Sequence, residues 1–312
     1  MATVVADYAN LAIKGLKEPF KLALEKNLEQ YRNQPFVKFY NTNEWSEIFS
    51  STEGISGVRE LADEETPDVV SLDEGYNMTI TPVRKGVGMV ITQTTMVRAG
   101  DDTTKIDTYL MEQRNQLLKS VSNDVLVDAF YAYNNAFNSS ATTLAPDGAE
   151  LCGTHTYNGG GTFANKTTAQ FSETAWDAVE LYAGRFTDPT DTTKPMPLNF
   201  TAILVKKGSA VAKLAKQLFA TGVTPTAWGD VNVYAGSVKV VETPYISYTN
   251  RKYWFAIDES IETPVVLGMV KTPTFEDPIT LENQSIRTNV IGYWKKGIVK
   301  MPIGVYGGDG TV

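Results

Sequence analysis

The chain has very little of the chemistry that most metal proteins and many enzymes use. Its 312 residues include one histidine, His155, and one cysteine, Cys152. A single thiol excludes an internal disulfide framework, and a lone histidine argues against a His/Cys metal site. Asp, Glu, Tyr and Lys side chains remain available for catalysis, so the composition weakens an enzyme interpretation without excluding it. We expect no metal and no cofactor.

Long apolar runs and clustered positive charge are also absent. No run approaches the roughly 20 apolar residues that a helix needs to cross a bilayer. The opening Met-Ala-Thr-Val-Val-Ala-Asp lacks the basic region of a secretory signal, so we expect folding in a reducing cytoplasm, away from membranes. With a net charge of −8 and scattered Lys and Arg, the chain is poorly suited to grip phosphates. If such a protein works near DNA, we expect it to enclose the DNA and not to bind it tightly.

Helical patterns mark three parts of the chain. Residues 105–137 contain no Pro or Gly and carry apolar residues at helical spacing, which predicts one helix about 50 Å long. Shorter helices are expected over 173–186 and 208–220. Residues 11–32 are also helical in pattern, but Gly15 and Pro19 interrupt the start. Two interpretations stay open for this segment: an arm ordered by a neighbouring molecule, or the first helix of the core.

Strand patterns predict two hairpins and a compact α/β unit. One hairpin joins Tyr76–Thr81 to Val87–Thr94 through a turn over Pro82–Gly86. A second joins residues 285–291 and 297–301. Further strands, rich in β-branched and aromatic residues, are expected over 200–205, 231–235, 238–241 and 252–257.

The Gly-rich stretch Leu151-Cys-Gly-Thr-His-Thr-Tyr-Asn-Gly-Gly-Gly161 has two interpretations, a phosphate-binding loop or a structural turn. It lacks the strand–loop–helix order and the Lys-Ser/Thr ending of phosphate cradles, which favours the turn. For His155 we expect a local hydrogen bond.

The order of these pieces resembles the major capsid proteins of tailed bacteriophages with the Hong Kong 97-type fold, and most closely the Mu-like major head subunits. The resemblance covers nearly the whole chain after Asn41. It rests on Thr81-Pro-Val-Arg-Lys-Gly-Val-Gly-Met-Val-Ile-Thr92, the Gly-rich stretch 151–161, Leu204-Val205 before a helix, and Tyr253-Trp-Phe-Ala-Ile-Asp258. No single piece is diagnostic, but their common order is fairly specific.

The resemblance implies an α+β fold made of five parts. These are an N-terminal arm (1–58), an extended β-ribbon loop (59–102), a peripheral domain with a long spine helix (103–198), a compact axial α/β domain (199–272) and strands that return to the peripheral domain (273–312). The ribbon would lie across a neighbouring subunit. The residues expected at this inter-subunit contact are Met78, Ile80, Arg84, Lys85, Met89 and Ile91.

The implied function is a major head protein that self-assembles into the hexamers and pentamers of an icosahedral phage head. Its expected partners are further copies of itself, a scaffolding protein, a portal, a decoration protein in some members, and packaged double-stranded DNA held without sequence specificity. It would be made in the bacterial host cytoplasm and reside in the virion. Some members crosslink a ribbon lysine to a neighbour, but Lys85 has no identifiable partner for this, so we expect a solvated or ion-pairing charge.

Two alternatives come from other classes. An encapsulin-like nanocompartment would share the fold and the assembly but enclose enzymes. A cytoplasmic α/β enzyme using Asp, Glu or Tyr in a cleft would stay a small oligomer.

Overall fold

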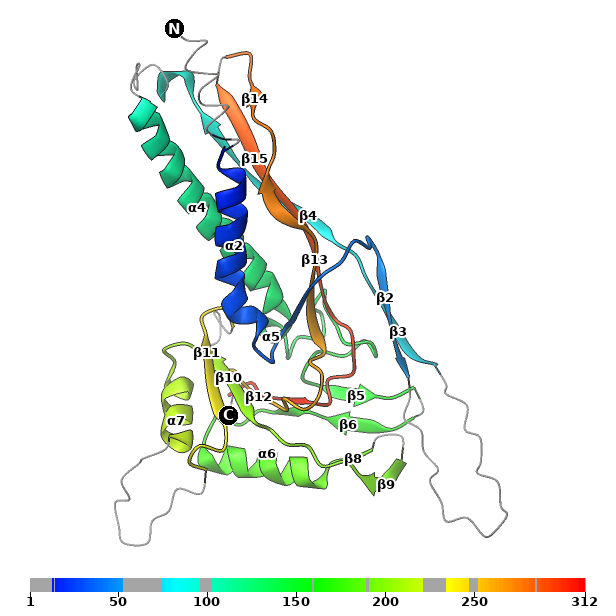
Figure 1. Cartoon of the computed structure of the whole chain (residues 1–312). Helices are drawn as coiled ribbons and strands as arrows, with labels where there is room; N and C mark the ends of the chain where they lie inside the picture. The colour runs from blue at the N-terminus through cyan, green and yellow to red at the C-terminus, as the bar shows by residue number, and fades with distance from the viewer. Residues whose placement is uncertain are drawn as a thin grey trace, which may run out of the picture.

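The computed structural model describes residues 13, 15–52, 74–95, 103–158, 160–188, 191–220, 234–246, 252–283 and 285–311. The described chain forms an elongated upper body of two helices beside a long twisted sheet, and a wider lower body around a second sheet (Figure 1). In chain order the elements are α2 (Lys17–Arg32), β1 (Lys38–Asn41), β2 (Glu47–Thr52), β3 (Glu74–Ile80), β4 (Val83–Ile91), α4 (Thr103–Ala129), α5 (Tyr131–Asn134), β5 (Thr154–Thr156), β6 (Thr162–Ala164), β7 (Lys166–Thr167), α6 (Glu173–Arg185), β8 (Thr187–Asp188), β9 (Asp191–Pro195), β10 (Ala202–Lys206), α7 (Ala210–Phe219), β11 (Lys239–Thr243), β12 (Trp254–Ile257), β13 (Val265–Phe275), β14 (Ile279–Thr280), β15 (Ile286–Ile298) and β16 (Val305–Gly308).

The upper sheet is built around the long strand β15. It pairs antiparallel with β13 on one side and with β4 on the other, and β1 adds in parallel to the outer edge of β13. Helices α2 and α4 lie together on one side of this sheet (Figure 1). Large apolar side chains from both helices and from the sheet form one continuous buried cluster. Burial of this area is the main stabilising contribution to the upper body.

The long helix predicted from residues 105–137 is confirmed as α4 over Thr103–Ala129, followed by the one-turn α5. Leu117, Val121 and Val125 are buried on the side that faces the sheet. Phe130 leaves the helix for a single residue, with φ −93° and ψ 11°. Its ring stacks on Tyr245 at 6.2 Å, so the local bend accompanies a packing contact.

Helix α2 packs its apolar stripe into the same core. Phe20, Leu24 and Leu28 are all essentially inaccessible to solvent. Of the two interpretations left open for residues 11–32, the first helix of the core is therefore correct for the described part. The interpretation as an arm ordered by a neighbouring molecule is wrong there. Pro19 lies in the first turn, where a missing N–H is tolerated.

The lower body has a sheet in the order β11-β10-β12-β16-β7, with α6 and α7 packed on it. The predictions of α6, α7, β10, β11 and β12 are confirmed to within a few residues. Both helices begin at serine caps: the Ser172 and Ser209 hydroxyls accept hydrogen bonds from the N–H groups of Ala175 and Ala212. The expected strand at 231–235 falls mainly outside the described residues.

The first predicted hairpin is wrong. Residues 74–80 pair with 47–52, forming a two-stranded ribbon of β2 and β3, whereas residues 83–91 pair with β15 in the upper sheet. Only Thr81 and Pro82 separate β3 from β4, so the chain passes almost straight from the ribbon into the sheet (Figure 1). Alternation along 83–91 places every second side chain against α4, and this long-range burial outweighs the turn-forming tendency of Pro82–Gly86.

The second predicted hairpin is also wrong, because residues 286–298 form one continuous strand. Gly292 lies within this strand. In the structure a Cβ at Gly292 would meet Pro273 Cγ at 2.6 Å, so glycine is needed for the close approach of two strands. The two bodies do not follow the ranges expected for the peripheral and axial domains. β13 lies mostly within the range 199–272 expected for the axial domain but belongs to the upper sheet. α6 and β16, expected in the peripheral domain, pack in the lower body.

Candidate functional site

Asp128, near the end of α4, is the centre of a buried charge cluster that joins the helix to the upper sheet. Its carboxylate accepts hydrogen bonds from Trp294 Nε1 and Lys296 Nζ, each at 2.7 Å, and lies 2.7 Å from Lys85 Nζ. Burial alone would raise the pKa of Asp128, but these donors outweigh it and hold the pKa below its ordinary value of 3.8. The cluster therefore carries an ionised carboxylate at neutral pH.

Aromatic rings complete this cluster. Lys296 Nζ lies 3.6 Å from the centroid of the Tyr131 ring, and Lys85 Nζ lies 5.5 Å from the Trp294 ring. Cations over ring faces gain additional electrostatic attraction. The two lysines thus contact carboxylate and ring at once, which fixes α4 against β4 and β15.

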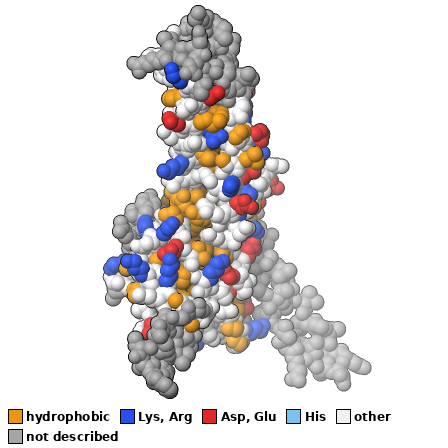
Figure 2. All heavy atoms as spheres, turned by 60° about the vertical axis from the view of Figure 1, so that its left-hand side comes forward, with side chains coloured by type: hydrophobic (Ala, Val, Ile, Leu, Met, Phe, Trp, Pro, Cys, Tyr) orange, Lys and Arg blue, Asp and Glu red, His pale blue; other side chains and the backbone are white. Residues whose placement is uncertain are grey.

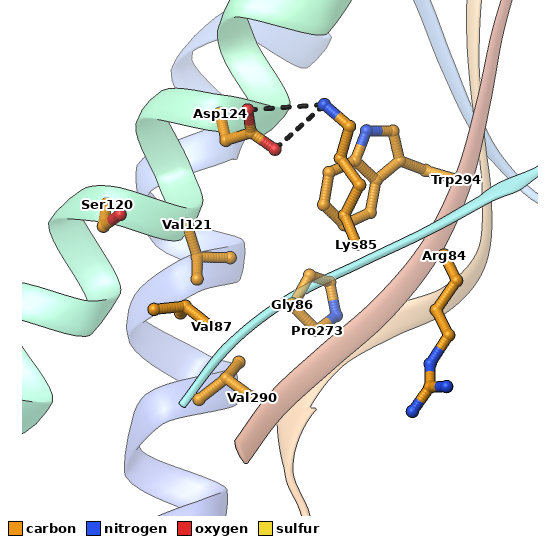
Figure 3. A pocket seen from close by; sticks show the side chains of 10 residues that line it. All are labelled: Arg84, Lys85, Gly86, Val87, Ser120, Val121, Asp124, Pro273, Val290 and Trp294. Atoms are coloured by element: carbon orange, nitrogen blue, oxygen red, sulfur yellow. Dashed lines mark hydrogen bonds and ion pairs between the residues drawn. The ribbon is translucent and has the colours of Figure 1, made fainter. Parts of the chain in front are cut away.

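A cleft of about 480 Å³ opens beside this cluster, between α4 and the sheet (Figure 3). Lys85 points across it to Asp124, with Nζ–Oδ2 at 3.1 Å, while Arg84 points away on the other side of β4. Burial would lower the pKa of Lys85, yet its hydrogen bonds to Asp128 and Asp124 raise it. A protonated, ion-paired amine is a poor nucleophile, so this cleft offers charge and shape without an activated lysine.

A second ion pair, formed by a buried lysine and a partly buried carboxylate, lies where the ribbon leaves the upper body. Lys295 Nζ, with no exposed side-chain surface, lies 2.6 Å from Glu47 Oε2 of β2. Tyr40 donates a 2.8 Å hydrogen bond to the same carboxylate. Gly297 allows close contact here, since a Cβ would meet Ile80 Cγ2 at 2.7 Å. The ribbon is therefore attached to the sheet by both charge and packing.

The residues predicted at an inter-subunit contact fall in three different environments. Ile80, Met89 and Ile91 are 4%, 6% and 2% exposed, buried within the subunit itself. Lys85 is in the ion pairs described above, which agrees with the ion-pairing role expected for it. Arg84 is exposed on the sheet, and Met78 is half-buried against the small cluster at the ribbon base. The inter-subunit role of the six residues stays a prediction, for which Arg84 and Met78 are now the main candidates.

Sequence reasoning missed two exposed apolar side chains at the ribbon. Trp45 is 58% exposed and Ile48 is 66% exposed. Trp45 contacts Tyr293 of β15, with ring centroids 5.5 Å apart. The signal available in the sequence was a tryptophan beside an alternating strand pattern. The ion-paired residues Glu47, Asp128 and Lys295 gave no local signal, because each is paired with a residue far away in the chain.

The Gly-rich stretch forms a small hairpin of β5 and β6, which confirms the structural-turn prediction. His155 Nδ1 lies 3.0 Å from Asp147 Oδ2, the local hydrogen bond expected of it. Both side chains are buried, and the imidazole stacks on Phe163. Cys152 is buried too, and burial raises the pKa of its thiol, which makes it inert at neutral pH.

Across the described residues, no group of three or more His, Cys, Asp or Glu side chains is placed to hold a metal ion. Each helix in these ranges is too short or too polar to span a lipid bilayer. What the described surface does offer is a projecting ribbon, exposed aromatic and apolar side chains, and charged sheet faces.

Comparison with known proteins gives a match at the level of fold. No family model matches the sequence, and no curated protein matches it. Among solved structures, the capsid of Myoviridae phage XM1 aligns with a TM-score of 0.51 and 10% identity, covering 87% of this chain and 89% of the other. A structure from Microbacterium phage Oxtober96 gives 0.50 and 10%, covering 87% and 88%.

These alignments confirm the predicted α+β architecture: the chain has the Hong Kong 97-type fold of phage capsid proteins. A virus-like particle from Pyrococcus furiosus also aligns, with a TM-score of 0.44, 8% identity, and coverage of 94% of this chain and 99% of the other. That similarity is too low to support an argument about function.

Proposed function

We propose that this chain is the structural major capsid protein of a tailed bacteriophage, which assembles into an icosahedral head around double-stranded DNA. The observation that carries the proposal is the alignment with the capsid of phage XM1, which extends over most of both chains. Shared fold alone does not assign function. The shape of the subunit and its surface supply the additional support.

The shape suits closed shells built from one repeated contact. The ribbon of β2 and β3 projects from one side of the molecule, while α2, α4 and α7 form the opposite side (Figure 1). A projection on one side that meets a different patch on the next copy is a heterologous contact, which generates rings. Many such contacts act together, so each can be individually weak.

The net charge of the chain suits a protein shell that encloses DNA. With a net charge of −8, the chain has no electrostatic drive to hold duplex DNA tightly. Scaffolding protein, portal and decoration protein are the further partners that we propose, with assembly in the host cytoplasm and residence in the virion. Within this class we propose the Mu-like major head subunits, on the motif order given above.

We propose a non-catalytic role for the chain. The cleft beside Asp128 holds Lys85, which is already ion-paired, and the side chains of His155 and Cys152 are buried. The encapsulin-like shell and the cytoplasmic enzyme are the alternatives that the experiment must separate.

The test is to express the chain in bacteria and purify it without denaturant. We expect particles large enough to elute in the void volume of a gel-filtration column and to appear as shells, tubes or sheets with hexameric units in negative-stain images. Co-expression with a phage's scaffolding protein should increase the yield of closed shells. Uniform free shells that contain host protein would favour a nanocompartment, and a stable small oligomer under all conditions would contradict the capsid proposal.

A further inference from the structure

One part of the lower body carries positive charge in a chain that is acidic overall. Residues 192–229 contain five lysines and no Asp or Glu. Residues 243–257 contain one arginine and one lysine, again with no acidic residue. The whole chain has 36 acidic and 28 basic residues, so charge of one sign is gathered in these two segments. They form β10, α7 and β12 of the lower body.

The fold brings several of these lysines to one end of the lower sheet. β10 and β12 are antiparallel and in register, so the chain leaves the sheet at Lys206 and Lys207 beside the point where it enters at Lys252. The Lys207 N–H donates a 3.0 Å hydrogen bond to the Thr243 carbonyl, which fixes this turn to the end of β11. Gly208, with φ +73°, then turns the chain into α7.

Helix α7 extends the group of lysines along the surface. Its apolar side packs on the sheet, while Lys213 and Lys216 lie on the exposed side. These two residues are three positions apart, so they are neighbours on the helix surface. Figure 2, in which the α7 side of the molecule comes forward, shows Lys and Arg side chains gathered on the lower body. We call the following five residues the basic surface: Lys206, Lys207, Lys213, Lys216 and Lys252.

At least two lysines of the basic surface have uncompensated charge. Lys207 and Lys213 are exposed and form no ion pair with any residue that the structure describes. Lys216 Nζ lies 2.7 Å from Glu242 Oε2, but its side chain is still 56% exposed. Exposed ion pairs are weak, so this ammonium group also remains accessible to a further anion.

The chemistry of the basic surface suits the phosphates of a nucleic acid duplex. Lysines are mobile point charges that contact phosphate without reading sequence, whereas base recognition uses the paired donors of Arg, Asn or Gln. A duplex carries one negative charge per about 1.7 Å of its axis, so along the roughly 15 Å of α7 it meets the lysines in almost any register. A protein partner would need an apolar centre, and Leu214 is the one large apolar side chain of α7 that is exposed.

We infer that the basic surface contacts the phosphates of the enclosed double-stranded DNA, and that the subunit sits in the shell with α7 toward the interior. This inference rests on the proposed function, to which it adds the surface that meets DNA and the orientation of the subunit. Few lysines take part in a chain of net charge −8, so each contact is weak and is lost as salt rises. Many copies acting together still hold the DNA without fixing it in place.

The first test measures binding of a short fluorescein-labelled DNA duplex of mixed sequence to dissociated subunits of the full chain. The surface variant carries Lys207→Gln and Lys213→Gln. The matched control carries Lys26→Gln and Lys271→Gln, two exposed lysines of the upper body, so both variants have the same net charge. Thermal unfolding checks that both are folded. Fluorescence anisotropy then gives the affinity over a series of salt concentrations.

We expect the surface variant to bind the duplex at least roughly fivefold more weakly than the wild type at low salt. The slope of log affinity against log salt should become shallower by about 2, one for each phosphate contact removed. The control should bind as the wild type does, and a duplex of different sequence should give the same affinities. Poly-L-glutamate at the same concentration of charge should displace the duplex only weakly.

The second test concerns the orientation of the subunit. Empty closed shells of the wild-type chain should leave added duplex unbound, because the basic surface is enclosed. The same protein should bind the duplex after the shells are dissociated.

Four outcomes would decide against part or all of this account. Equal duplex affinities of the wild type and the surface variant would show that the basic surface is not used. Tighter binding of poly-L-glutamate than of the duplex, lost in the surface variant, would indicate an acidic protein partner in place of DNA. Intact shells that bind the duplex as well as free subunits do would place the surface on the outside. Failure of the wild-type chain to form shells, with normal duplex binding by subunits, would contradict the proposed function while supporting the basic surface as a DNA contact.

Discussion

Lys295 of β15 and Glu47 of β2 form a 2.6 Å ion pair at the base of the ribbon, and the lysine side chain is wholly buried. Their neighbours in the sequence face elsewhere: Lys296 reaches Asp128 on the other side of the sheet. Two adjacent lysines therefore hold two different elements, the ribbon and the long helix, to opposite faces of one strand. This follows from the alternation of side chains along β15.

Removing the carboxylate at the ribbon base should destabilise the subunit. Glu47→Gln leaves the buried Lys295 ammonium without a counter-charge, and breaking such a pair costs about 3 kcal/mol or more. Tyr40→Phe removes only one hydrogen bond to the same group and should cost about 1 kcal/mol. Denaturant unfolding of dissociated subunits measures both. Equal effects of the two variants would contradict the importance of the ion pair.

Acid should weaken the joint between α4 and the sheet. Because the pKa of Asp128 is held below 3.8 in the folded state, its ionised form contributes stability at pH values above 3.8, and this contribution is lost as the pH falls through the lower folded value. Asp128→Asn removes that dependence and leaves Lys85 and Lys296 with an uncharged partner. We expect the variant to be less stable at pH 7 and to show a shallower fall in stability between about pH 4 and pH 2. Unfolding curves across this range provide the measurement, and parallel pH profiles would count against the assignment.

A charge on the buried side of α4 should disrupt the upper body. Val121 is 7% exposed in the seam between the helix and the sheet, so Val121→Asp should cost several kcal/mol, about the penalty for an unpaired buried polar group. Met111 lies on the same helix and is 47% exposed. Met111→Asp is therefore the matched control and should change the unfolding free energy by about 0.5 kcal/mol or less. Similar losses for both would mean that Val121 is not in a packed seam.

Two deletions distinguish the role of residues 53–73, which connect β2 to β3, from the role of β4 in the upper sheet. Removing residues 53–73 and joining Thr52 to Glu74 through Gly-Ser should leave a soluble, folded subunit that no longer forms particles. Removing Met78–Thr92 should instead prevent folding, because it takes β4 out of the upper sheet together with the buried Ile80, Met89 and Ile91. Circular dichroism and gel filtration distinguish these results. Normal particles from the shorter chain lacking 53–73 would contradict the ribbon's part in assembly.

The helices were predictable from the sequence because their signals are local. Periodic apolar residues without Pro or Gly marked α4, and α6 and α7 carried both the periodicity and serine caps. The choice of strand partners was not predictable in the same way. Residues 74–80 and 83–91 each have a strand pattern, and nothing near them indicates that one pairs with 47–52 and the other with 286–294.

The candidate interface shows the same division. Arg84 was expected at a contact with a neighbour, and its side chain is exposed on β4. Ile80, Met89 and Ile91 were expected at a neighbour's surface, but alternation along a strand says only that they share a face. Whether α4 or solvent lies over that face depends on contacts with residues far away in the chain.

The sequence by itself determined the helical segments, the β-forming segments, the acidic balance of the chain, and the order of parts that predicted its fold. The tertiary structure alone decided which strands pair, which side of each strand is buried, and which carboxylates meet Lys85, Lys295 and Lys296. The reason is physical. A helix closes its hydrogen bonds within four residues, whereas a strand takes its partner, and a buried charge its counter-charge, from anywhere in the chain.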